Sequence, residues 1–90
     1  MKDPAFKLQS AFLLHQEGKL AQAEALYKDV LRLQPANFDA LFLLATAAAQ
    51  QQKFEESLGL FERALKNNPR HPEALNNRGN VLKELKRFEE

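Results

Sequence analysis

The sequence repeats itself with a period of 34 residues, and this period limits the folds that the chain can adopt. The stretch Leu14–Pro35 can be laid over the stretch Ala48–Pro69. Tyr27 then aligns with Phe61, and Pro35 with Pro69, each pair being 34 positions apart (61 − 27, 69 − 35). A fixed period between about 20 and 50 residues is typical of arrays in which each repeat is one supersecondary unit stacked on its neighbours.

Each period holds two segments in which apolar residues recur every three or four positions, the spacing of a helix. This spacing predicts helices at about 5–16, 21–33, 38–51, 55–67 and 73–85. Gly18 suits the end of the first helix, and Pro35 and Pro69 end the second and the fourth. Asp3, followed by Pro4, is suited to cap the first helix, and Asn37 the third. The fifth should end before Phe88, where a new helix would begin. The sequence therefore predicts an all-α fold.

Two features predict how these helices pack. The third helix is apolar on nearly every side from residue 40 to residue 49, which favours a central position. Small residues recur at Ala11, Ala45 and Gly79, again 34 apart, and we expect Tyr27 and Phe61 to lie opposite the first two. A small residue facing a large ring lets two helices approach closely and fill the space between them.

Composition excludes several classes of protein. The chain has 90 residues, enough for one domain over 1–90. Its 13 Lys and Arg against 12 Asp and Glu argue against nucleic-acid binding, which favours a basic excess. The longest apolar stretch is far shorter than the roughly 18 residues of a membrane span, and no secretory signal precedes it. We expect a soluble, cytoplasmic domain.

Nothing in the sequence predicts catalysis, a cofactor or a metal. There is no cysteine, so disulfides and thiolate metal sites are excluded. His15 and His71 have no partner at catalytic or metal-binding spacing, and we expect both to be isolated surface histidines. We therefore predict that the chain is not an enzyme.

The order of small, bulky and proline positions resembles the tetratricopeptide repeat family. The matching positions are Ala11, Leu14, Gly18, Leu20, Ala23, Tyr27, Val30 and Pro35, then Ala45, Ala48, Phe54, Ser57, Phe61, Ala64 and Pro69, and in part Gly79, Leu82 and Phe88. The resemblance implies repeats at 4–37 and 38–71, a half repeat at 72–90, and a right-handed superhelix of helix hairpins. The sequence departs from the family pattern at Lys7, Ser10, Gln52 and Arg78.

The resemblance also implies a concave groove that binds a peptide or a partner protein. Its lining would be Leu8, Gln9, Phe12, Gln16, Phe42, Leu43, Thr46, Gln50, Asn76, Asn77, Asn80 and Glu84. Leu8, Phe12, Phe42 and Leu43 offer an apolar anchor site, although Phe12, Phe42 and Leu43 can equally belong to the core. Some family members grip a C-terminal carboxylate with a clamp of Lys, Asn and Arg. This chain has Leu8, Phe12, Leu43, Glu73 and Asn77 there, so we predict no such recognition.

Three functions stay open at this point. The apolar set favours a protein interaction module. The cluster Asn76, Asn77 and Asn80 resembles repeats in bacterial relatives of the O-linked N-acetylglucosamine transferases, which favours substrate-presenting repeats at the N-terminus of a larger enzyme. The fifth helix lacks a following partner, so we expect its apolar side to be open, with Leu75, Leu82, Leu85 and Phe88. That favours either a longer parent protein or self-association as a homo-oligomer.

Overall fold

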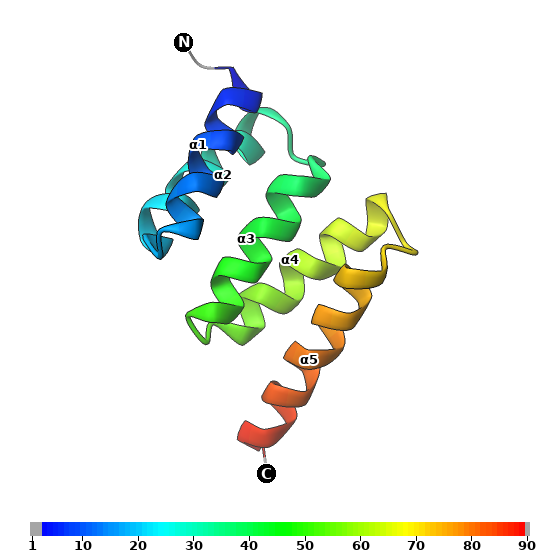
Figure 1. Cartoon of the computed structure of the whole chain (residues 1–90). Helices are drawn as coiled ribbons and strands as arrows, with labels where there is room; N and C mark the ends of the chain where they lie inside the picture. The colour runs from blue at the N-terminus through cyan, green and yellow to red at the C-terminus, as the bar shows by residue number, and fades with distance from the viewer. Residues whose placement is uncertain (1–2, 90) are drawn as a thin grey trace.

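A computed structural model describes residues 3–89, which form five helices and, within that range, no strand. The helices are α1 (Pro4–Gln16), α2 (Leu20–Leu33), α3 (Phe38–Gln50), α4 (Phe54–Asn67) and α5 (Pro72–Glu89). α1 pairs with α2, and α3 with α4; α2 packs on α3, and α4 on α5. α1 and α5 lie at the two ends of this stack, with α3 between them (Figure 1). The all-α solenoid of hairpins predicted from the sequence is confirmed.

The 34-residue period sets where the first helix of each unit begins. Asp3 caps α1 by accepting a hydrogen bond from the Ala5 backbone N–H at 3.0 Å. Asn37 caps α3 through the N–H of Ala40, at 2.9 Å. The next position in the series is His71, whose Nδ1 accepts from the N–H of Ala74 at 3.2 Å. Each cap satisfies a donor that the first turn of a helix cannot pair internally.

The turn inside each hairpin follows the same period. Gly18 has a φ of 82°, and Gln52, 34 positions later, has a φ of 64°. This left-handed conformation costs glycine little, but it brings the Cβ of any other L-residue close to the following carbonyl oxygen. The turn therefore forms in both repeats, but Gln52 adopts a strained backbone to make it.

The small and large residues expected to pack together are buried in one core. Tyr27 and Phe61 are fully buried, as are Ala11 and Ala45. Ser57, also fully buried, donates from Oγ to the Ala45 carbonyl oxygen at 2.8 Å, so α3 and α4 are joined by a polar contact inside the core. The central position of α3 is confirmed, because this helix buries Ala40, Leu41, Leu44, Ala45, Ala47 and Ala48.

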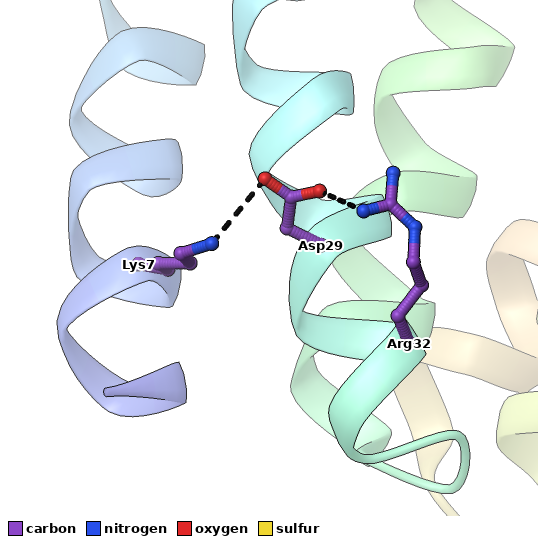
Figure 2. A network of polar contacts seen from close by, with 3 residues as sticks. All are labelled: Lys7, Asp29 and Arg32. Carbon is purple, nitrogen blue, oxygen red and sulfur yellow. Dashed lines mark hydrogen bonds and ion pairs between the residues drawn. The ribbon is translucent and has the colours of Figure 1, made fainter. Parts of the chain in front are cut away.

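Lys7 occupies, in the first repeat, a position that is apolar and buried in the second, and it forms an ion pair with Asp29. Its Nζ lies 3.4 Å from Oδ2 of Asp29 on α2, and Arg32 donates to the other carboxylate oxygen of Asp29 (Figure 2). Partial desolvation raises the pKa of Asp29, but the hydrogen bonds and charges of Arg32 and Lys7 outweigh it and hold that pKa below its usual value. The network thus joins α1 to α2 at the position where the second repeat has Leu41, a buried core residue.

The prediction that the fifth helix ends near Leu85, before a turn, is wrong. α5 continues to Glu89, through the positions where the first two units turn. Those turns contain Gly18 or Gln52, whereas residues 83–87 are good helix formers, and Arg87 donates to Glu84 one turn earlier at 3.3 Å. The side chain of Phe88 lies outside the described residues. Leu75 and Leu82 are exposed on α5, at 40% and 43%, as expected. Leu85, expected on the same open side, is instead half-buried and packs against the core.

None of the helices in the described part of the chain is long and apolar enough to cross a membrane.

Candidate functional site

Two pockets lie along the first helices of the three units. The α3–α5 pocket, of about 260 Å³, is lined by Thr46, Ala49, Gln50, Phe54, Phe61, Asn77, Asn80, Val81 and Glu84. The α1–α3 pocket, of about 450 Å³, is lined by Ala5, Leu8, Gln9, Phe12, Asp39 and Leu43. Most of the residues assigned to the groove from the sequence therefore line one pocket or the other.

The α3–α5 pocket combines an apolar floor with a polar rim. Ala49, Phe54 and Val81 contribute carbon surface, and the amides of Gln50, Asn77 and Asn80 stand around it. A primary amide offers two donors and an acceptor, which matches the N–H and C=O groups of a peptide backbone. Two other polar groups have partners within the chain. The hydroxyl of Thr46 donates to the Phe42 carbonyl at 2.9 Å, and Glu84 accepts from Arg87.

The Gln50 amide is held in place by a chain of hydrogen bonds that begins in the core. Its Oε1 lies 2.7 Å from Nε2 of His15, and the Nδ1 of that ring lies 3.0 Å from the hydroxyl of Tyr27. Because Oε1 can only accept, Nε2 is the donor of that contact, and in the neutral ring Nδ1 is then left to accept from the phenol. Burial raises the pKa of Tyr27 to about 12, so the phenol keeps its proton at neutral pH.

The prediction that both histidines are isolated on the surface is wrong. His15 is half-buried and links α1, α2 and α3 through Tyr27 and Gln50. His71 is half-buried too, and it caps α5. The sequence held a signal for each role. A buried tyrosine hydroxyl needs a partner, and His71 stands 34 positions after the cap Asn37.

Phe42 belongs to an aromatic cluster instead of a pocket lining. Its ring stacks on Phe38 with centroids 5.8 Å apart, and meets Phe61 edge-on at the same distance. The His71 ring lies 4.7 Å from Phe38 and 5.4 Å from Phe42. The cluster joins α3, α4 and the start of α5, so Phe42 positions the helices. Gln16 and Asn76 are exposed and line neither pocket.

The α1–α3 pocket is the more apolar of the two. Phe12 is 42% exposed, and Leu8 and Leu43 are half-buried beside it. Asp39, in the first turn of α3, contributes the charged group of the lining. An apolar pocket with so accessible a ring is suited to receive a side chain from a partner.

A third hollow, between α2 and α4, was not predicted from the sequence. It measures about 590 Å³ and is lined by Lys28, Leu31, Arg32, Leu44, Glu55, Glu56, Gly59, Leu60 and Arg63. Gly59 leaves this surface open, since a Cβ added there would meet no atom within 4 Å. No group of three or more potential metal ligands occurs among residues 3–89.

Comparison with known proteins agrees with this architecture. Among solved structures, the first TPR of Spaghetti (RPAP3), bound to the HSP90 peptide SRMEEVD, is 25% identical, with a TM-score of 0.90 over 93% of this chain and 67% of that one. YrrB, a TPR protein with an unusual peptide-binding site, is 24% identical, with a TM-score of 0.89 over 94% of this chain. The chain spans 44% of the YrrB chain. No curated protein sequence matches.

A family model gives the assignment. The model of the tetratricopeptide repeat matches residues 13–63 and again residues 43–90, so the two matches together cover most of the chain. The matched residues include the small, aromatic and proline positions that repeat every 34 residues. The chain therefore belongs to the tetratricopeptide repeat family.

Proposed function

We propose that this chain is a protein interaction module that holds a segment of a partner in the groove formed by α1, α3 and α5. The observation that carries the proposal is the pair of pockets on these helices, one apolar and one ringed by amides. The Spaghetti domain, which matches over nearly the whole chain, is bound to a peptide. The groove would lie across repeats 4–37 and 38–71 and the half repeat 72–90, and would bind its ligand without chemical change.

The two pockets would bind different parts of the ligand. The α1–α3 pocket would receive an apolar side chain against Phe12, and the amides of the α3–α5 pocket would hold the peptide backbone. In this arrangement the apolar anchor supplies most of the affinity, because removing carbon surface from water is the larger favourable contribution. The amides would fix the direction and register of the chain.

The test begins with a phage-displayed library of random peptides selected on the immobilised chain. Binding of selected peptides is then measured for Phe12→Glu and Asn77→Ala. Leu33→Glu and Asn76→Ala are matched controls, since both residues are exposed and neither lines a pocket. We expect both groove variants to weaken binding and both controls to retain it. Equal losses in groove and control variants would contradict the proposal.

A second candidate is that these repeats present protein substrate to an enzyme, such as a bacterial relative of the O-linked N-acetylglucosamine transferases. The observation in its favour is that Asn77 and Asn80 both line the α3–α5 pocket. It predicts that Asn77→Ala abolishes binding whereas Phe12→Glu does not. A cytoplasmic location stays a prediction from the sequence.

A third candidate is self-association through the apolar side of α5. Leu75 and Leu82 are both exposed there, whereas the corresponding residues of the second repeat, Leu41 and Ala48, are buried. Apolar side chains on an uncovered helix face favour contact with a second copy. This candidate concerns a different surface from the groove, so the two activities can coexist.

A further inference from the structure

The charged residues that line the groove have one sign. Asp39 lies in the α1–α3 pocket and Glu84 in the α3–α5 pocket, and the described residues lining these two pockets include no Lys or Arg. The chain as a whole is nearly balanced, with 13 basic and 12 acidic residues. The hollow between α2 and α4, by contrast, has charges of both signs in its lining: Lys28, Arg32 and Arg63 with Glu55 and Glu56.

We propose that the groove selects partner segments in which apolar residues stand beside Lys or Arg, and disfavours acidic segments. The inference rests on the proposed function, because it names the chemical class of peptide that the same groove would bind. Each pocket would take one apolar side chain, and the carboxylate in its lining would attract the neighbouring basic group. Complementary charge across an interface also suppresses partners of the wrong sign.

Both carboxylates have a second role, which the test has to separate from binding. Glu84 pairs with Arg87 one turn away, but the Arg87 side chain is 75% exposed, and exposed pairs of this kind are weak. Asp39 lies in the first turn of α3, where a negative charge stabilises the positive end of the helix dipole. Glu55 occupies the corresponding turn of α4 and lines neither pocket of the groove, so it reproduces the dipole effect away from the site.

An acidic peptide, the kind that the groove should disfavour, is present in a related structure and serves as a probe. The peptide SRMEEVD, bound by the Spaghetti domain, has three acidic residues among its last four. A carboxylate would need cationic side chains to hold it, but the α1–α3 pocket offers the carbon surface of Leu8, Phe12 and Leu43. The charged residues in the two pocket linings, Asp39 and Glu84, are both negative. This peptide should therefore bind weakly.

The experiment compares three sets of arrayed peptides. Every peptide carries two leucines at varied separation, and the residues beside each leucine are Lys in the first set, Gln in the second and Glu in the third. SRMEEVD is included as a further probe. We expect the Lys set to bind about three- to tenfold more tightly than the Gln set, as expected for two solvent-exposed ion pairs, and the Glu set to bind least. The preference should shrink as salt screens the charges.

Charge reversal within the protein provides the decisive comparison. The double variant Asp39→Lys with Glu84→Lys should reverse the preference toward the Glu set. The double variant Glu55→Lys with Glu62→Lys changes the net charge by the same amount outside the groove and should leave the preference unchanged. If the charge-reversed variant fails to fold, the neutral double variant Asp39→Asn with Glu84→Gln replaces it. This variant should bind the Lys, Gln and Glu sets equally well.

The outcomes separate this inference from the function on which it rests. If the Gln or Glu set binds as tightly as the Lys set, and Phe12→Glu abolishes that binding, the groove binds peptides but the charge preference is refuted. Tight binding of SRMEEVD would refute it as well. If none of the sets binds, both the inference and the proposed function are overturned.

Discussion

Tyr27 is the single tyrosine of the chain, so its ionisation can be followed directly by the absorbance of the phenolate. Its hydroxyl donates to His15, and burial raises its pKa from 10.0 to about 12. Because the folded state holds this proton more tightly than the unfolded state, its contribution to stability is complete below pH 10. That contribution is lost as the pH rises toward 12.

We therefore expect the phenol of the native chain to titrate near pH 12, or abruptly with alkaline unfolding. A spectrophotometric titration at alkaline pH, with circular dichroism recorded in parallel, measures both events. The chain in denaturant provides the reference and should titrate near 10. A native titration near pH 10 with the fold intact would show that the phenol is accessible and would contradict the buried geometry.

Gln52 carries backbone strain that a single substitution should relieve. Its φ of 64° matches the 82° of Gly18 at the same place in the first repeat. We expect Gln52→Gly to stabilise the chain by about 1 kcal/mol, the order of the left-handed penalty for an L-residue. Gln51→Gly is the matched control, because Gln51 has a φ of −96° and gains nothing from glycine. Thermal melts that rank the control above Gln52→Gly would argue against strain at this turn.

The period of 34 residues made most of these residue roles predictable. The exceptions are residues whose type is unusual for the role they have. The caps Asp3 and Asn37, and the turn at Gly18, follow from residue type and spacing. His71 was missed as a cap because histidine is not among the residues that usually cap helices. The burial of Glu24 was not predicted, because charged residues are seldom buried. Its carboxylate is nevertheless covered, and it accepts a hydrogen bond from Lys53 at 3.3 Å.

At the scale of helices, the fold depends on one large ring in each hairpin. Tyr27 and Phe61 are fully buried in the core that also holds Ala11 and Ala45. We expect Tyr27→Ala and Phe61→Ala each to lower the free energy of unfolding by about 3–5 kcal/mol, because each leaves a cavity that neighbouring helices cannot fill. Phe6→Ala is the control, since Phe6 is 63% exposed and its loss should change stability little. Urea unfolding that showed both ring variants unchanged would refute this packing.

The elements were predictable where residue type and periodicity agree. Helical spacing and the prolines located both ends of each helix from α1 to α4 to within one residue. α5 was predicted too short, because the period suggested a turn that the helix-forming residues 83–87 do not make. The lining of the two pockets could not be fully predicted, since it depends on how each side chain packs: Phe42 enters an aromatic cluster and lines neither pocket.

At the scale of the whole molecule, the stack is elongated, 47 × 27 × 19 Å, with apolar side chains exposed at both ends. α5 exposes Leu75 and Leu82, and α1 exposes Phe6 and Leu13, at 63% and 54%. We expect the mean mass to rise above 10.3 kDa with concentration in light scattering. Leu75→Gln with Leu82→Gln should hold the chain as a monomer.

The opposite end gives the control for this prediction. If two α5 helices pair symmetrically, Phe6→Gln with Leu13→Gln will leave association unchanged. If copies stack end to end, both double variants will abolish it, because a head-to-tail contact uses both surfaces. A strict monomer at every concentration would refute self-association.

The hydrogen-bond chain from Tyr27 through His15 to Gln50 connects the interior to the rim of the α3–α5 pocket. A peptide that draws the Gln50 amide toward itself would lengthen its contact with the His15 N–H, and the imidazole would then adjust against the phenol. We expect occupancy of the groove to alter, in this way, the near-ultraviolet spectrum of a ring buried beneath it. The chain would then report binding through its own tyrosine, without an attached dye and, with no tryptophan present, without a correction for one.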